Sequence, residues 1–145
     1  MARCPLCAEA AGSFYEDLPR RWTYGRCAHC ALVFREGTLT ESQERHRYEQ
    51  HKNHPGQAGY RDFLAPMVEE ISRRCAPGGE GLDYGCGPGP VLALLLGERG
   101  MRVALHDPHF APDPAALERE YDFVTCTEAA EHFRQPALDF ARLAR

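Results

Sequence analysis

The sequence predicts an α/β protein, the first half of a doubly wound parallel sheet, preceded by a small cysteine-bearing domain. Three observations predict this fold class. Strand-like and helix-like segments alternate from residue 60 onward. A glycine-rich turn between Asp83 and Pro90 joins a strand-like segment to a helix-like one. Two C-x2-C pairs stand near the N-terminus.

Composition divides the 145 residues into three parts. Residues 1–45 carry both cysteine pairs and are rich in turns, so we expect them to form the small domain. Residues 46–59 are charged and end in the breaker-rich "NHPGQAG", which indicates a linker or a lid. Residues 60–145 hold the α/β pattern. An open parallel sheet normally has more strands than this part encodes, so we expect that domain to be incomplete.

The N-terminal cysteines predict a structural zinc site. Of seven cysteines, four form the pairs Cys4/Cys7 and Cys27/Cys30, and an odd total argues against a disulfide framework. Two such knuckles complete a tetrahedral four-thiolate site, which leaves no open position for zinc catalysis. Bound zinc contributes roughly 10–16 kcal/mol in comparable peptides, which a domain this small needs for folding. Chance pairing of reduced cysteines is the alternative.

The role of this zinc-ribbon-like domain is open between recognition and capping of its neighbour. Arg20, Arg21 and Arg26 can form a small basic–aromatic face with Trp22 and Tyr24, suited to RNA or a partner protein. The alternative, which we favour, is that Trp22 and Tyr24 pack the ribbon. His29 lies inside the second knuckle, and we expect it to be solvated and not to bind the metal.

Apolar spacing predicts each element of the α/β part in turn. Apolar residues recur at helical spacing from Tyr60 to Cys75, and "APGG" at 76–79 ends that helix. The expected strands are 81–84, 101–106 and 121–127. The expected helical segments are 91–99, a single turn at 115–120, a turn or short helix at 128–133, and a helix that begins at Pro136.

The glycine loop has the form Asp83-x-Gly85-x-Gly87-x-Gly89. Between a strand and a helix, such a turn approaches a ligand closely and presents backbone N–H groups to it. The loop is not a dinucleotide fingerprint, because Pro90 occupies the sixth position of G-x-G-x-x-G, and it is not a P-loop, because no G-K-[ST] follows. An acidic residue before the glycines suits a ligand with a cationic end better than a pyrophosphate.

Three motifs together resemble class I S-adenosylmethionine (SAM) dependent methyltransferases, whose fold is Rossmann-like. D-x-G-x-G-x-G resembles the first motif of that family. Asp107 closes the second expected strand, where the family has an acidic residue that binds the ribose. "YDFVTCTEAAEHF" at 121–133 resembles the fourth strand and the segment after it. The N-terminal "CPLC…YGRCAHCALVF" resembles the zinc-binding domain that precedes some of these enzymes.

The resemblance implies a role for each matching residue. Residues 85–87 would line the methionine part of SAM, Asp83 would orient its ammonium end through water or backbone groups, and Asp107 would accept hydrogen bonds from both ribose hydroxyls. Without the resemblance, Asp83 reads as a loop-capping carboxylate and Asp107, followed by Pro108, as a turn former. The candidate cofactor-binding residues are Asp83, Gly85, Cys86, Gly87, Gly89, Asp107 and Glu128.

The segment E-x-x-E-H places Glu128, Glu131 and His132 close together. On a helix, Glu128 and His132 would share a face. The string resembles the divalent-metal motif of small-RNA 2′-O-methyltransferases and of ubiquinone-pathway O-methyltransferases, which implies a metal that orients an acceptor hydroxyl. His132 as a general base, with Glu128 beside it, is a second interpretation. The third, which we favour, is a structural role for His132 under the cofactor pocket.

The resemblance suggests a lid before the first strand, and the chain departs from the family in two ways. In related enzymes the segment before the first strand folds over the cofactor, so Tyr48, His51 and Tyr60 are candidate lid residues; a solvated charged helix is the alternative. Residues 108–120 show no third strand and no adenine-contacting residue. The family also continues for three more strands after the helix that begins at Pro136.

We therefore expect a SAM-dependent methyltransferase whose acceptor is a small molecule. A net charge of −4 and the lack of a basic stripe disfavour nucleic acid as the acceptor. Two alternatives stay open: an RNA methyltransferase that uses the ribbon for recognition, and a non-catalytic protein that binds SAM or a partner. The longest apolar run, 91–96, is too short to span a bilayer, and no apolar signal segment follows Met1. A cytoplasmic location is expected, and the oligomeric state is left open.

Overall fold

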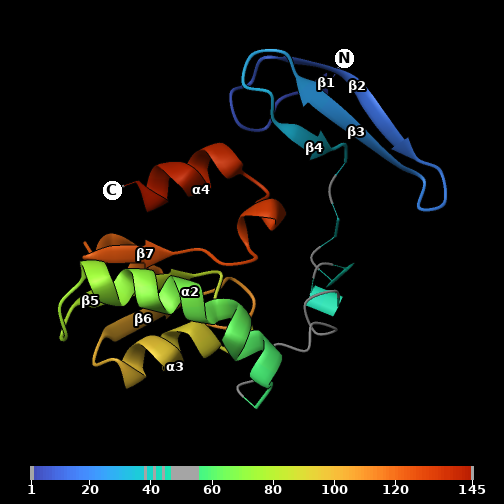
Figure 1. Cartoon of the computed structure of the whole chain (residues 1–145). Coiled ribbons are helices and arrows are strands. Elements are labelled where there is room, and N and C mark those ends of the chain that lie inside the picture. The colour runs from blue at the N-terminus through green and yellow to red at the C-terminus, as the bar shows by residue number, and fades with distance from the viewer. Residues whose placement is uncertain (1, 38, 41, 44, 47–55, 145) are drawn as a thin grey trace. The chain divides into compact units, whose positions relative to one another are not determined.

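The computed structural model describes residues 2–37, 39, 40, 42, 43, 45, 46 and 56–144 (Figure 1). Its contacts divide the chain into two compact units. One contains Met1–Thr40 together with Phe133–Arg145, and the other contains Glu41–His132. The first unit includes the cysteine pairs, and the second includes the glycine loop.

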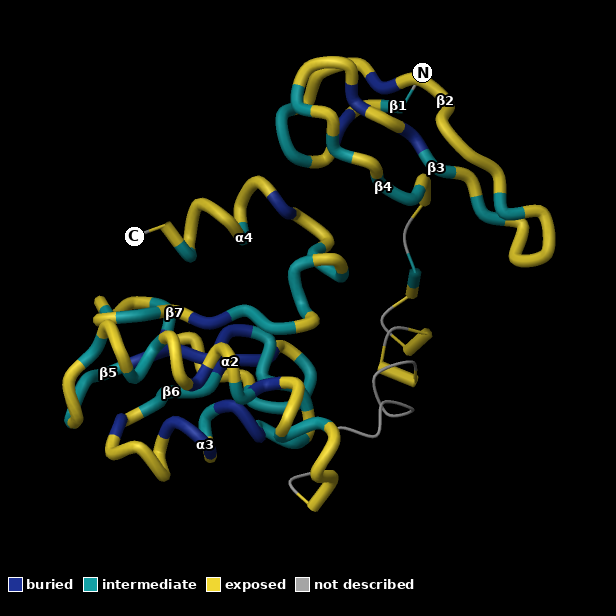
Figure 2. The backbone as a smooth tube through the Cα atoms, viewed as in Figure 1, coloured by how far each residue is buried: buried dark blue, intermediate teal, exposed yellow. Residues whose placement is uncertain are grey.

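A four-stranded antiparallel sheet in the order β1-β2-β3-β4 forms the N-terminal unit. Its strands are β1 (Ala2–Arg3), β2 (Ala10–Asp17), β3 (Trp22–Cys27) and β4 (Val33–Arg35). The hairpin β2–β3 is the longest pairing, and a bulge interrupts its register between residues 13 and 15. Most of its residues are exposed, so this unit has little apolar core of its own (Figure 2).

Three parallel strands form the sheet of the second unit, in the order β6-β5-β7. They are β5 (Glu80–Tyr84), β6 (Arg102–His106) and β7 (Phe123–Thr125). Because β5 is central and pairs on both edges, it is buried from its second residue to its last. The carboxyl ends of the three strands therefore meet at one edge, where an open α/β sheet binds its ligands.

Helices α2 (Ala58–Arg74) and α3 (Val91–Glu98) share one hydrophobic core. Leu64 and Val68 of α2 pack with Leu92 and Leu96 of α3, and Phe123 of β7 packs against this cluster from the sheet. Figure 2 shows the buried residues concentrated on β5 and α3. The prediction of a mixed α/β fold with a parallel sheet is confirmed; the second helical layer of a doubly wound sheet stays a prediction.

Gly81 explains how the sheet and β7 fit together. A Cβ placed on Gly81 would lie 2.1 Å from Cε2 of Phe123, so a larger residue would displace that ring. The close approach lets Phe123 reach the core cluster across β5. Glycine thus has a packing function in this strand that is separate from the glycines of the loop.

The remaining elements differ slightly from the expectations. The single turn is the 3-10 helix η1 (Pro114–Glu118), begun by Asp113, whose carboxylate accepts hydrogen bonds from two backbone N–H groups. Strand β7 is shorter than 121–127, since only its three central residues pair with β5. Short helix η2 (Ala130–His132) and helix α4 (Pro136–Leu143) follow. No helix among the described residues is long and apolar enough to cross a membrane.

Candidate metal centre and cofactor site

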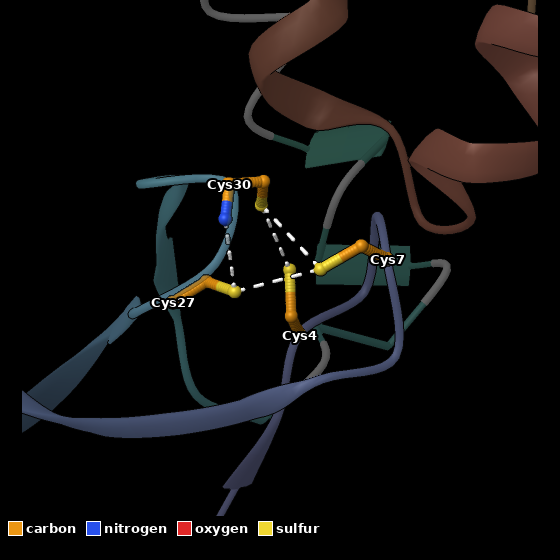
Figure 3. Close-up of side chains that lie close together, drawn as sticks. All are labelled: Cys4, Cys7, Cys27 and Cys30. Atoms are coloured by element: carbon orange, nitrogen blue, oxygen red, sulfur yellow. Dashed lines mark hydrogen bonds between the residues drawn. The ribbon is translucent and has the colours of Figure 1, made fainter.

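The sulfur atoms of Cys4, Cys7, Cys27 and Cys30 all lie within 4.8 Å of one another (Figure 3). Cys4 and Cys30 are 3.5 Å apart, Cys7 and Cys27 are 3.5 Å apart, and Cys7 and Cys30 are 3.6 Å apart. Around a zinc ion with Zn–S bonds of about 2.3 Å, a tetrahedron has sulfur–sulfur edges of about 3.8 Å. The group therefore has the composition and the dimensions of a four-thiolate zinc site.

Two equivalent backbone turns hold these sulfurs. The N–H of Ala8 donates to the carbonyl of Cys4, and that of Ala31 donates to the carbonyl of Cys27. Ala8 and Ala31 are both left-handed, with φ of 62° and 61°. A left-handed alanine costs about 1 kcal/mol or more in conformational free energy. Because both cysteine pairs contain this strained turn, we infer that the two turns have the same function.

The second knuckle also stabilises a thiolate. The backbone N–H of Cys30 points at Sγ of Cys27 at 3.5 Å. Hydrogen bonds from the N–H groups of Cys30 and His29, together with those from the thiols of Cys7 and Cys30, lower the pKa of Cys27 to about 6, while the pKa values of Cys7 and Cys30 are raised. The thiolate is the form that binds a metal, so the local backbone favours the ligand state of this sulfur.

Aromatic and arginine side chains cover one face of the ribbon. The guanidinium carbon of Arg35 lies 5.3 Å from the ring centroid of Trp22, and that of Arg20 lies 5.8 Å from it. Arg26 lies 5.8 Å from the ring of Phe14, which is 54% exposed. The half-buried Trp22 thus contacts two arginines, as a basic–aromatic face would, while Phe14 stays open to solvent. The packing of the ribbon by Trp22 and Tyr24 stays a prediction.

In the second unit, the glycine loop leaves β5 in two left-handed steps. Gly85 and Gly87 have φ of 77° and 65°. The N–H of Gly85 donates to the carbonyl of His106 at 2.7 Å, which ties the loop to the end of β6. A Cβ on Gly85 would lie 2.5 Å from Cβ of Ala129, whereas a Cβ on Gly87 would meet nothing within 4 Å. The loop is closed at Gly85 and open at Gly87.

Asp107 binds this loop from the neighbouring strand. Its Oδ2 accepts the N–H of Gly87 at 3.0 Å, and its Oδ1 accepts the N–H groups of His109 at 2.8 Å and Phe110 at 3.1 Å. The side chain is 8% exposed. A carboxylate has about four acceptor positions, so this arrangement leaves one for a ligand hydroxyl. Asp107 is therefore the turn former of the alternative interpretation, and it keeps capacity for a ribose contact as well.

Asp83 lies at the end of β5 and is 4% exposed. The hydroxyl of Thr125, at the end of β7, donates to its Oδ1 at 3.0 Å. Burial raises the pKa of Asp83 to about 6, although the Thr125 hydrogen bond opposes this and the negative charge of Asp107 adds to it. A buried carboxylate with a raised pKa at the ligand edge of a sheet is typical of a functional site.

Cys86, between the two left-handed glycines, keeps its proton. Burial raises the pKa of its thiol to about 12, and the charges of Asp83 and Asp107 act in the same direction. A thiol in this state is not a nucleophile. Cys86 therefore contributes backbone and volume to the loop. Gly89 lies just before α3, and its carbonyl accepts the N–H of Val91.

Helix α2 brings Tyr60 to the same edge. Burial raises the pKa of its hydroxyl, and the negative charges of Asp83 and Glu128 raise it further. About two turns further along the helix, the sulfur of Met67 accepts a hydrogen bond from the hydroxyl of Thr127 at 3.3 Å. The helix thus contacts the segment that follows β7. The other candidate lid residues, Tyr48 and His51, lie outside the described residues.

The E-x-x-E-H segment does not form the expected helical face. Glu128 is left-handed, with φ of 52°, and the 3-10 turn η2 begins only at Ala130. A residue in that conformation cannot continue a right-handed helix, so Glu128 and His132 do not share a face. Within the part of the chain that the structure describes, the cysteines alone form a group of metal-binding donors. Nε2 of His132 lies 3.9 Å from Oε1 of Glu131.

Sequence reasoning missed two residues of this site. The sequence predicts Thr125 only as part of the strand 121–127. Its hydroxyl, between apolar neighbours at a strand end, is a signal for a buried polar contact, because buried polar groups are hydrogen-bonded. His106 is buried, stacks on Tyr84 with 5.4 Å between ring centroids, and contacts the carbonyl of Asp113 through Nδ1 at 2.9 Å. It fixes the turn that follows Asp107.

Comparison with known protein families identifies a domain in this chain. A family model described as "Methyltransferase domain" matches residues 57–145, which is more than half of the chain. The matched segment begins one residue before α2 and includes the glycine loop, Asp107 and the segment after β7. No curated protein matches the chain.

Proposed function

Because the chain belongs to the methyltransferase domain family, we propose that it binds SAM at the carboxyl edge of its parallel sheet and transfers the methyl group to a small-molecule acceptor. The observation that carries this proposal is the joint placement of two acids around one glycine loop. Asp83 is the last residue but one of β5, and Asp107, directly after β6, accepts a hydrogen bond from the N–H of Gly87 inside the loop.

Two features of the described residues support SAM as the ligand. The loop is open at Gly87, where an added Cβ would meet no atom within 4 Å, so a ligand can approach the backbone there. The negative charges of Asp83 and Glu128 act on Tyr60, and that of Asp107 acts on Asp83, so the site is acidic. SAM carries an ammonium and a sulfonium cation, which such a site favours.

When bound, SAM supplies a methyl group whose bond to the cationic sulfur breaks as an acceptor lone pair bonds to its carbon. The protein has to align the acceptor with that bond and to exclude water. In this proposal Asp83 orients the ammonium end, Asp107 accepts one ribose hydrogen bond, and Tyr60 covers the site from α2. Glu128, whose backbone is left-handed and whose negative charge acts on Tyr60, is the further candidate residue of this site.

The N-terminal unit in this proposal is a zinc ribbon with a structural ion. The two equivalent knuckles and the sulfur–sulfur distances of 3.5–3.6 Å support it. Zinc would stabilise a unit whose sheet has little buried apolar area. Zinc content near one ion per chain, abolished by Cys7→Ser, is the expected result.

Calorimetry with SAM and with its demethylated product, S-adenosylhomocysteine, tests the function. We expect binding with a micromolar Kd, weakened about tenfold or more by Asp107→Ala, because the variant loses both the ligand contact and the anchor of Gly87. Asp62→Ala, which removes an exposed carboxylate from α2, is the matched control and should bind as the unmodified chain does. A Kd above the millimolar range for both ligands would refute SAM binding by this chain.

One observation favours RNA as a second candidate acceptor. The exposed Phe14 lies beside Arg26, and an aromatic ring next to a guanidinium is a common platform for an unpaired base. RNA binding that weakens with salt and is lost in Cys27→Ser would support this acceptor. The net charge of −4 favours the small molecule.

A further inference from the structure

A buried hydroxyl controls the carboxylate at the end of β5. Thr125 and Asp83 are each 4% exposed, and the register of the parallel pair β5–β7 sets them directly opposite one another. The hydroxyl of Thr125 donates to Oδ1 of Asp83 at 3.0 Å. The two side chains are thus locked together by adjacent strands of a rigid sheet.

The same hydroxyl has a second acceptor within reach. Oγ1 of Thr125 lies 3.3 Å from the carbonyl oxygen of Leu82. When Asp83 is ionised, the single hydroxyl proton serves its carboxylate. When Asp83 is protonated, the hydroxyl can donate to the carbonyl of Leu82 and accept a hydrogen bond from the carboxyl O–H of Asp83. A hydrogen bond to a charged acceptor is about twice as strong as one to a neutral acceptor, so Thr125 favours the ionised form.

We propose that Thr125 is a positioning residue for the cofactor: its hydroxyl fixes Oδ1 of Asp83, which leaves Oδ2 as the oxygen that receives the ammonium group of SAM. The inference rests on the proposed function, because it assigns the ammonium of SAM to Asp83. Thr125 itself contacts only protein groups in this assignment.

The surroundings of Asp83 make this support necessary. Burial and the charge of Asp107, from the end of β6, both favour the protonated form of Asp83. The negative charge of Asp83 raises the pKa of Cys86 in the loop and of Tyr60 on α2, and the charge of Glu128 also raises the pKa of Tyr60. None of these four groups, Asp107, Cys86, Tyr60 and Glu128, can carry a positive charge. None of them therefore offsets the negative charge of Asp83. The Thr125 hydrogen bond acts against them and lowers the pKa of Asp83.

The test compares Thr125→Val, which keeps the shape but removes the hydroxyl, with Thr125→Ser, which keeps the hydroxyl. The affinity of the full chain for S-adenosylhomocysteine, which retains the ammonium, is measured by calorimetry between pH 5.5 and 8.5. In the unmodified chain the affinity should fall below a midpoint near pH 6. In Thr125→Val the midpoint should move upward by about one pH unit, and Thr125→Ser should match the unmodified chain.

Titration of the Asp83 carboxyl by carbon NMR in the ligand-free protein gives an independent readout. The inference is overturned if Thr125→Val leaves both the midpoint and the NMR titration unchanged, or if Thr125→Ser behaves as Thr125→Val does. If the unmodified chain binds neither SAM nor its product at any pH, the assignment of Thr125 to cofactor binding falls together with the proposed function. The NMR titration then still shows whether Thr125 controls Asp83. Should Thr125→Val fail to fold, Thr125→Cys, a much weaker donor of similar volume, should move both midpoints in the same direction.

Discussion

Replacing Asp83 by asparagine should stabilise the ligand-free protein at neutral pH while it removes the charge that we propose binds the cofactor. Asp83 is 4% exposed at the ligand edge of the sheet, so its ionised form is costly in the folded chain. Asparagine keeps an oxygen that can accept the Thr125 hydroxyl, now bonded to Oδ1 at 3.0 Å. The substitution therefore removes the charge with little change in shape.

The magnitude follows from the pKa of Asp83. Burial raises it from 3.8 to about 6 in the folded protein. Between these values the folded state binds more protons than the unfolded state, so stability falls as the pH rises through this window. Above about pH 7 the full cost is present, and 2.2 pKa units at 1.36 kcal/mol each give about 3 kcal/mol. About 2 kcal/mol of this cost appears between pH 4.5 and pH 7.5.

Urea unfolding of the two proteins at pH 4.5 and pH 7.5 measures this effect. We expect the difference in unfolding free energy, Asp83→Asn minus the unmodified chain, to be about 2 kcal/mol more favourable at the higher pH. The comparison between pH values cancels any fixed cost of the new amide donors. Asp62→Asn, on the exposed side of α2, should show almost no such change. A difference that is equal at both pH values, or that shrinks as the pH rises, would refute the raised pKa and the physical account of the site.

Substitutions at four further positions test the ribbon and the loop. Cys27→Ser should lose zinc and unfold the ribbon, seen as loss of amide protection in its strands, because bound zinc contributes roughly 10–16 kcal/mol in comparable peptides; retained zinc would contradict the four-thiolate site. Gly85→Ala should lower the free energy of unfolding by about 2–4 kcal/mol and abolish SAM binding, because its Cβ would lie 2.5 Å from Cβ of Ala129. The Cβ of Gly87→Ala would meet no atom within 4 Å, so this variant should lose only about 1–2 kcal/mol through left-handed strain. Thermal unfolding measures both losses. Asp107→Ala should destabilise by about 2–4 kcal/mol, because three backbone N–H groups lose their acceptor, and Asp107→Asn should recover more than half of this loss; equal losses in both would exclude the capping role.

Much of the fold could be predicted from the sequence because its signals are local. Helical spacing of apolar residues located α2 and α3, and the glycine-rich turn located the end of β5. The C-x2-C pairs identified four sulfurs that the structure brings within 4.8 Å of one another, since each knuckle is a local turn. The failure at Glu128 has the opposite cause. Its residue type permits a helix, but Ala129 packs against Gly85 from another part of the chain, and the backbone turns left-handed just before it.

The sequence by itself determined which residues could take part: the cysteine pairs, the glycine loop and the acids that end two strands. Their order along the chain and the local chemistry of glycine and cysteine are sufficient for that. Only the tertiary structure decided how they are used. The register of β5 with β7 places the Thr125 hydroxyl against Asp83, and the pairing of β5 with β6 brings Asp107 to the N–H of Gly87. These contacts join residues 20 to 42 positions apart in the chain. Burial, which only the folded chain provides, raises the pKa of Asp83.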